Sequence, residues 1–279
     1  MAWQGPFKKL AFITLDLEPD HCDLVAGNSY DSFRGLDELI GVVRDYSLPL
    51  TVFATGMVLQ ERKDEVRALI DAGAEIELHS YSHKSGREGV DEISRGVLAY
   101  RKTLGYSPRG YRAPLGMVSR SEIDYLASEG FLFDSSIFPS IFPGRFCNVF
   151  SDTRPFFYPR TGLLEIPISV IPFIRFPVAL SYIQLVSFPV FRSLSSIFRL
   201  PGIVVIDFHL HDIFPSREFD NLPLRWKCVY SRCGFRDRTR GMRDLKHLVT
   251  LIKARGYVFE KLLDLYHRVR EKVGITKNS

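Results

Sequence analysis

Two histidines lie four residues apart, directly after a short apolar segment. They are His79 and His83, and residues 74–78 before them are predicted to form a buried strand. Neutral imidazole nitrogens bind zinc and other late first-row metals well, so two of them beyond a strand end can converge on one ion. The same spacing also occurs in loops that bind no metal. A metal site needs at least one further ligand from elsewhere in the chain.

The elements around this pair alternate between apolar strands and amphipathic helices. Strands are predicted at residues 10–15, 50–54, 74–78, 109–112, 131–133, 163–168, 203–208 and 257–259. Helices are predicted at residues 36–46, 57–72, 90–104, 119–128, 243–254 and 262–273. Such an order predicts parallel strands with helices outside them. In folds of this kind the chemistry lies at the carboxyl ends of the strands.

Polar residues with chemical potential follow several of these strands. Asp16, Arg112 and Asp134 each stand at the end of one strand, and His209 and His211 follow the strand at 203–208. Because the carboxyl ends of parallel strands meet at one edge of a sheet, we expect these side chains to share a site with the histidine pair.

The composition is that of an ordinary globular protein. The 279 residues are 46% hydrophobic and 25% charged, with a net charge of +5. We expect one domain over residues 1–279, with an apolar insert at about 171–200 and a basic segment at about 214–243. The basic balance suits an anionic substrate or a membrane surface, although a solvated basic face is the simpler explanation. No nucleic-acid-binding signature is present, so a nucleic-acid partner is not expected.

The sequence predicts a cytoplasmic protein. Its first nine residues lack the apolar core of a signal peptide, and no stretch of about 20 apolar residues is free of charges and prolines. A reducing compartment leaves the four cysteines without disulfides. Peripheral attachment to a membrane stays open.

Taken in order, the motifs resemble those of the polysaccharide deacetylases of the carbohydrate esterase family 4 type, which remove N-acetyl groups from sugars with a divalent metal. The matching segments are Thr14–Glu18, His79–His83, Arg112–Gly116, Asp134–Ser136, Glu165–Pro167 and His209–Asp212. The resemblance extends from about Leu10 to Tyr266. It implies an α/β fold, an irregular (β/α)7 TIM-like barrel. It also implies a hydrolase acting on carbon–nitrogen bonds other than peptide bonds.

The resemblance implies a metal held by Glu18, His79 and His83. Zinc is the default ion, with cobalt, nickel, manganese and iron as alternatives. Most family members carry the acidic ligand where this chain has Leu17, but one subgroup has an Asp-x-Glu pattern similar to residues 16–18. Residues 16 and 18 face the same side of an extended strand, which favours Glu18. Asp20 and Asp23 are weaker candidates.

Catalytic roles follow from the same resemblance. Asp16 is expected to act as the general base that takes a proton from water, held in place and ionised by Arg112. A histidine would protonate the leaving amine. His209 and His211 both qualify, and His209 is preferred because it directly follows the strand. Asp207 could orient an imidazole or simply face a helix.

Substrate contacts are expected from Tyr111, Pro114 and Asp134, although Asp134 could instead cap a turn with Ser136. The expected substrate is an N-acetylated amino sugar in a glycan or glycoconjugate. One alternative is amide hydrolysis on a lipid-linked amino sugar or a non-sugar linear amide. An alternative of another class is a non-catalytic carbohydrate-binding module. The sequence leaves the sugar and the oligomeric state open.

Overall fold

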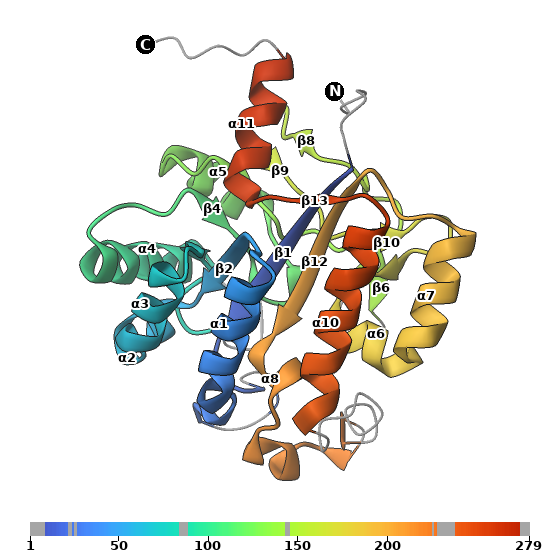
Figure 1. The fold of residues 1–279 in the computed structure, drawn as a ribbon. Coiled ribbons are helices and arrows are strands. Elements are labelled where there is room, and N and C mark those ends of the chain that lie inside the picture. Colours follow the sequence, from blue (N-terminus) through green and yellow to red (C-terminus); the bar gives the residue numbers. More distant parts are fainter. Residues whose placement is uncertain are drawn as a thin grey trace.

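A curled parallel sheet forms the centre of the molecule (Figure 1). The computed structural model describes residues 9–21, 24, 27–83, 89–142, 146–224, 226–227 and 238–273. The strands of the sheet follow the order β12-β1-β2-β3-β4-β5-β9-β8 and are parallel except for β8 with β9. Their bounds are β1 Leu10–Leu17, β2 Leu50–Ala54, β3 Glu75–Leu78, β4 Gly110–Tyr111, β5 Phe133–Asp134, β8 Phe156–Phe157, β9 Leu164–Glu165 and β12 Ile203–His209. A further strand, β13 (Val258–Phe259), pairs with the first residues of β1.

The chain after β9 brings the edges of the sheet together. Ser169 N donates to Val205 O of β12 at 3.1 Å, and Ala179 forms a parallel bridge with Asp207 of the same strand. These contacts curl the sheet toward a barrel. The predicted α/β fold with parallel strands in an irregular barrel is confirmed.

Helices cover the outside of the sheet (Figure 1). They are α1 Leu36–Asp45, α2 Gly56–Glu61, α3 Lys63–Asp71, α4 Val90–Leu104, α5 Arg120–Ser128, α6 Leu180–Val186, α7 Phe188–Ile197, α8 Leu210–Ile213, α10 Arg238–Ala254 and α11 Leu262–Val273. Short 3-10 helices are η1 Asp31–Gly35, η2 Pro114–Gly116 and η3 Arg217–Asn221. The single helix predicted for 57–72 was wrong, because Arg62 leaves helical geometry (φ −125°, ψ 45°) and separates α2 from α3.

Two small hairpins complete the fold. One joins β6 (Ile141–Phe142) to β7 (Phe146–Cys147), and the other joins β10 (Val170–Ile171) to β11 (Phe176–Pro177). The predicted apolar insert consists of this second hairpin followed by α6 and α7. Cys147 is a free, exposed cysteine. Cys22, Asp23, Cys228, Cys233 and much of the predicted basic segment lie outside the described residues.

Strand alternation separates two hydrophobic cores. Along β1, Ala11, Ile13, Leu15 and Leu17 pack under the helices in the outer core, whereas Leu10 and Phe12 belong to a second core inside the barrel. Helix α11 contributes to this second core through four buried side chains, Leu262, Leu265, Tyr266 and Val269. The interior is therefore apolar at the amino ends of the strands, and the inward positions become polar toward their carboxyl ends.

No helix in the described part of the chain is long and apolar enough to cross a bilayer.

Candidate active site

The inward-facing positions of β1 and β12 place several site residues side by side. Thr14 and Asp16 continue the inward row of β1, and Glu18 follows after Leu17, which packs in the outer core. On β12, Asp207 and His209 are the register partners of Thr14 and Asp16. The expectation that residues 16 and 18 share a side agrees with this arrangement.

Glu18, His79 and His83 form a compact cluster of potential metal ligands. Glu18 Oε2 lies 2.9 Å from His83 Nε2 and 3.4 Å from His79 Nε2. The three ligand atoms all lie within 4.8 Å of one another, and all three residues are buried. The donor set of two imidazoles and one carboxylate suits zinc and other transition metals.

The protonation state of the cluster fits a cation. His79 Nδ1 lies 2.8 Å from the carbonyl oxygen of Arg112. Because a carbonyl oxygen only accepts, the ring proton is on Nδ1, and the lone pair of Nε2 is the one that can bind a metal. Within the described residues, His79 Nε2 and Glu18 Oε2 are buried without a hydrogen-bond partner. Burial opposes ionisation of Glu18, but the neighbouring His83 and His79 outweigh it and hold the pKa of Glu18 well below its usual value. A metal ion would satisfy both orphaned atoms.

The loop that presents the two histidines has an unusual backbone. Ser80 and His83 adopt positive φ values of 62° and 49°. Gly56 N and Met57 N donate to the carbonyl oxygens of Ser80 and Tyr81 at 3.0 Å, which anchors the loop to the start of α2. Strained non-glycine residues persist where surrounding contacts fix them, and they are common at functional sites.

Arg112 connects the barrel interior to the site. Its side chain is 1% exposed, and Nη1 lies 2.7 Å from Asp16 Oδ1 and 2.7 Å from Asp207 Oδ1. On its other edge, Nε donates to the carbonyl oxygen of Ser135 at 2.9 Å and Nη2 to the Ser135 hydroxyl at 3.1 Å. A guanidinium held on both edges fixes the orientation of the Asp16 carboxylate.

The Asp207 carboxyl group on Arg112 has an unusual pKa. Burial and the negative charge of Asp16 raise the pKa of Asp207 to about 7, and Arg112 offsets only part of this. Asp207 is therefore largely neutral below pH 7. The hydrogen bond observed for the Asp207 carboxyl group is to Arg112 and not to an imidazole.

His209 faces the metal-ligand cluster. Its Nε2 lies 3.7 Å from Glu18 Oε1 and 3.9 Å from Asp16 Oδ2, while Nδ1 lies 3.3 Å from Asp212 Oδ2. Burial favours the neutral ring, but the Asp212 hydrogen bond and the charges of Glu18 and Asp212 raise the pKa of His209 well above its usual value. A protonated imidazole is thus available beside Asp16.

His211 occupies a different position. The chain turns into α8 at Leu210, so the alternation of β12 ends at His209. The ring of His211 stacks on that of His209 at 4.9 Å between centroids and contacts His21 at 4.3 Å. Burial and these two neighbouring imidazoles lower the pKa of His211 well below its usual value. The geometry separates two histidines that the sequence left as alternatives.

The three expected substrate residues are buried. Tyr111 has no exposed surface and packs edge-on against Phe131 at 6.1 Å between ring centroids. Pro114 is also buried, at the start of η2. Asp134 is fully buried and accepts a hydrogen bond from Ser136 Oγ at 2.5 Å, which is the turn-cap alternative. All three side chains are therefore too buried in this structure to present much surface to a substrate.

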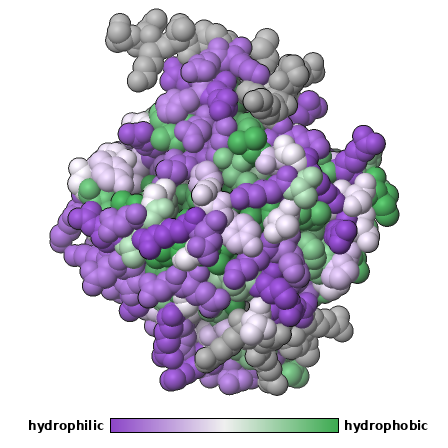
Figure 2. Space-filling model, viewed as in Figure 1, coloured by the Kyte–Doolittle hydropathy of each residue, from purple (hydrophilic) through white to green (hydrophobic). Residues whose placement is uncertain are grey.

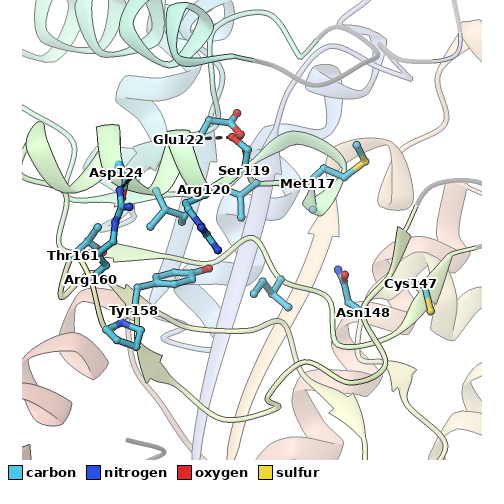
Figure 3. A pocket seen from close by; sticks show the side chains of 15 residues that line it. Met117, Ser119, Arg120, Glu122, Asp124, Cys147, Asn148, Tyr158, Arg160 and Thr161 are labelled. Atoms are coloured by element: carbon cyan, nitrogen blue, oxygen red, sulfur yellow. Dashed lines mark hydrogen bonds and ion pairs between the residues drawn. The ribbon is translucent and has the colours of Figure 1, made fainter.

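A cavity of about 900 Å³ lies next to the third motif (Figure 3). It is lined by residues after η2, by one side of α5, and by the β8–β9 turn. In Figure 3, Arg120 extends toward the aromatic ring of Tyr158 across this cavity, with Asn148 on the far side. Aromatic, amide and guanidinium groups of this kind bind the faces and hydroxyls of sugars.

Two site residues were missed or underestimated from sequence. From sequence, Asp212 was only part of a motif. In the structure its carboxylate orients His209, because Asp212 Oδ2 accepts a hydrogen bond from His209 N at 2.8 Å in addition to its contact with the ring. Asp207 was not linked to Arg112. The available signal was its spacing of two from His209, which places both on the inward face of β12.

Comparison with known proteins supports the motif analysis. Residues 8–133 match the family model described as polysaccharide deacetylase, a segment that includes the first three motifs but not His209. A peptidoglycan deacetylase from Helicobacter pylori is 27% identical over 120 residues, an alignment that covers 41% of each protein. The match therefore spans about two fifths of the length of that curated relative.

Solved structures show the same fold across nearly the whole chain. The structure of a probable polysaccharide deacetylase from Pseudomonas aeruginosa is 16% identical, with a TM-score of 0.63, covering 95% of this chain and 92% of that one. A CE4 family pseudoenzyme from Bacillus anthracis is 13% identical, with a TM-score of 0.55, covering 94% of this chain and 66% of that one. At such identities the likeness concerns the fold alone.

Proposed function

We propose that this chain, a member of the polysaccharide deacetylase family by its residues 8–133, is a metal-dependent hydrolase that removes an N-acetyl group from an amino sugar in a glycan or glycoconjugate. The observation that carries the proposal is the convergence of Glu18, His79 and His83 beside the pair of Asp16 and Arg112. A buried cluster with three potential ligands, an adjacent carboxylate and an adjacent imidazole fits amide hydrolysis.

A divalent metal held by Glu18, His79 and His83 would supply Lewis acidity, which lowers the pKa of water and polarises an amide carbonyl. Asp16 would accept the proton of the attacking water on Oδ2, the oxygen that Arg112 does not bind. Arg112 would keep Asp16 in one orientation. His209, with its raised pKa, would donate a proton to the amide nitrogen as the carbon–nitrogen bond breaks.

The substrate class rests on the cavity and on the relatives. A cavity of about 900 Å³ is large enough for sugar units next to the one that reacts. Tyr158 and Arg120 provide the stacking and hydrogen-bonding surfaces that carbohydrate recognition uses. The H. pylori relative is described as a peptidoglycan deacetylase, which favours an N-acetylated cell-wall sugar among the possible glycans.

The metal is tested by elemental analysis of purified protein. We expect about one equivalent of zinc or a related metal in the wild type, and a large loss in the His79→Ala, His83→Ala double variant. His267→Ala, an exposed histidine of α11, is the matched control and should keep the metal. Equal metal content in all three proteins would refute the ligand assignment.

The reaction is tested by acetate release from chitin oligomers, peptidoglycan fragments and lipid- or nucleotide-linked N-acetyl sugars. We expect release by the metal-loaded wild type, and a loss of at least a hundredfold in Asp16→Asn. A wild type that holds its metal and binds glycans without releasing acetate would instead indicate the non-catalytic carbohydrate-binding module. One structural relative is described as a pseudoenzyme, so a loss of catalysis has a precedent within the fold.

A further inference from the structure

One continuous segment of the chain is apolar and carries only positive charge. Residues 166–206 contain three arginines and no Asp, Glu, Lys or His. The segment includes the β10–β11 hairpin, α6 and α7, which lie together at one side of the molecule (Figure 1). Solvated surfaces normally mix charges of both signs, so the absence of acidic residues sets this segment apart.

The same segment exposes large hydrophobic side chains. Of the eleven most exposed large hydrophobic residues among those described, five belong to it: Phe173, Ile174, Leu185, Val190 and Ile197. Phe173 is 86% exposed and Ile197 is 71% exposed. Single exposed hydrophobic residues are ordinary, but a group on adjoining elements indicates a binding surface.

Four of these side chains lie on the hairpin tip and on α7, and we call them together the α7 face: Phe173, Ile174, Val190 and Ile197. Val190 and Ile197 are seven residues apart and therefore share a side of α7. The ring of Phe173 lies 6.4 Å from that of Phe198, just beyond the end of α7, so the hairpin tip adjoins the helix. Figure 2 shows hydrophobic side chains at this edge, next to hydrophilic ones.

The hairpin holds its tip in a strained conformation. Phe173 and Arg175 have positive φ values of 67° and 54°, a region that bulky residues rarely adopt. Arg175 Nη1 donates to the carbonyl oxygen of Ser151 at 3.1 Å, which ties the hairpin to a neighbouring loop. That loop carries Phe150, which is 96% exposed.

Arginines border the α7 face without acidic partners. Within the described part of the chain, Arg192, Arg199 and Arg255 form no ion pair with a carboxylate, and Arg192 and Arg199 are exposed. Arg255 follows α10, and its Nη2 donates to Ser196 Oγ of α7 at 2.8 Å, so the guanidinium charge of Arg255 lies against α7. Burial and the nearby Arg192 lower the pKa of Arg255, as expected where like charges gather.

From these observations we infer that the α7 face binds the surface of an anionic lipid bilayer. Aromatic and aliphatic side chains enter the boundary between headgroups and acyl chains, and arginines pair with lipid phosphates at the same depth. Charge complementarity favours this occupant, because the arginines that border the face outnumber the one acidic residue of the adjoining loop, Asp152, and a bilayer with anionic lipids carries a net negative charge. The binding needs no catalysis and stands independently of the proposed deacetylation.

The test is flotation of the full-length protein with lipid vesicles that contain no amino sugar. We expect the wild type to float with mixed phosphatidylcholine and phosphatidylglycerol vesicles, and much less with phosphatidylcholine alone or at high salt. The double variant Phe173→Ser, Ile197→Ser should lose at least tenfold in binding. The double variant Arg192→Glu, Arg199→Glu should lose a similar amount of binding to vesicles that contain phosphatidylglycerol. Its weaker binding to phosphatidylcholine alone should be unchanged.

The matched control is Leu98→Ser, which removes a side chain that is 63% exposed on α4, away from α7 (Figure 1). It should bind vesicles as the wild type does, and circular dichroism should show that every variant is folded. A wild type that does not float, or a Phe173→Ser, Ile197→Ser protein that floats normally, would overturn the inference. A dimer in sedimentation that these two substitutions abolish, without vesicle binding, would identify a second copy of the chain as the occupant instead.

Discussion

Arg112 Nη1 lies 2.7 Å from Asp16 Oδ1 in the centre of the barrel, and both side chains are almost completely buried. Asp16 lies on β1 and Arg112 directly follows β4, so the two residues are 96 positions apart in the sequence. The guanidinium also stacks on Phe53, with its central carbon 4.2 Å from the ring centroid. Arg112 is therefore fixed by packing as well as by charge, and it can hold Asp16 in one orientation.

Replacing Arg112 by methionine should impair both folding and catalysis. The change leaves Asp16 buried without its cation, and breaking a buried ion pair in this way costs about 3–5 kcal/mol. We expect a matching loss in the free energy of unfolding, measured with urea, and a fall in kcat of about a hundredfold or more at temperatures where the variant is folded. Arg101→Met breaks the partly exposed pair with Glu129 and should cost about 0–1 kcal/mol. A normal kcat in folded Arg112→Met would contradict the role of Arg112.

Asp212 should set the pH range of activity through His209. The carboxylate of Asp212 is the main contact that raises the pKa of His209, and protonated His209 is the proposed acid. Activity is then lost as the pH rises through that pKa. Asp212→Asn removes the negative charge, so the alkaline limb of kcat against pH should move to lower pH by about one unit.

The control for this profile is Asp220→Asn, an exposed carboxylate of η3, which should leave the alkaline limb in place. An Asp212→Asn enzyme with an unchanged limb would mean that another group is the acid. A second comparison, His211→Gln, should not shift the limb by the same amount, because its ring stacks on His209 whereas Asp212 supplies the carboxylate beside His209 Nδ1.

Substitutions of Glu18 and Asp20 should have different effects, on metal affinity for Glu18 and on stability for Asp20. Glu18→Gln should keep the fold and lower the metal affinity by at least tenfold, as titration with a competing chelator would show. Asp20 is buried and accepts hydrogen bonds from the backbone N (3.0 Å) and the hydroxyl of Ser32. Asp20→Asn should therefore lower the melting temperature and leave the metal affinity unchanged. The reverse pattern would make Asp20 the acidic ligand.

The period of the strands explains how much of this site was predictable. Alternation alone put Asp16 and Glu18 on one side of the strand and Leu17 on the other, and in the structure Leu17 packs in the outer core with Ala11, Ile13 and Leu15. The strand–helix order likewise predicted the parallel sheet and the edge at which the polar residues gather. These inferences need only local sequence and general rules of sheet geometry.

What alternation could not supply was the contact between distant elements. The meeting of Asp207 with Arg112 depends on how far the barrel curls, and no local pattern encodes this. Alternation did not separate His209 from His211, because the sequence does not mark where β12 ends, whereas in the structure α8 begins at Leu210. The helix predicted for 57–72 continues through Arg62 by periodicity, yet the backbone breaks there.

Arg120 should affect the binding of long substrates. Its side chain is exposed and extends into the cavity beside η2, toward Tyr158 (Figure 3). Arg120→Ala should raise KM for longer oligosaccharides by about threefold to tenfold, the value of one lost hydrogen bond, without changing kcat. The smallest substrate should be unaffected. Arg67→Ala, an exposed arginine of α3, is the control, and equal KM changes in both variants would exclude the cavity as a subsite.

Glu75 should make the protein less stable as the pH rises. It lies on β3 two residues before Glu77, and its carboxyl group accepts a hydrogen bond from Thr51 Oγ1 at 3.0 Å. Burial raises the pKa of Glu75 from 4.5 to about 7. Burial and the neighbouring Glu75 also raise the pKa of Glu77 well above its usual value. Two carboxyl groups thus remain protonated in the folded protein at a pH where the unfolded chain has lost both protons.

Because the folded-state pKa is the higher one, the stability associated with Glu75 is complete below about pH 4.5 and is lost as the pH rises to about 7. Glutamine resembles the protonated carboxyl group, so Glu75→Gln should match the wild type near the lower end of this window. Above its upper end the variant should be more stable by about 1–3 kcal/mol in urea unfolding. Glu38→Gln, an exposed residue of α1, should show no such divergence. Parallel stability curves for wild type and Glu75→Gln would mean that Glu75 is ionised in the folded protein and that Thr51 and its surroundings stabilise the charge.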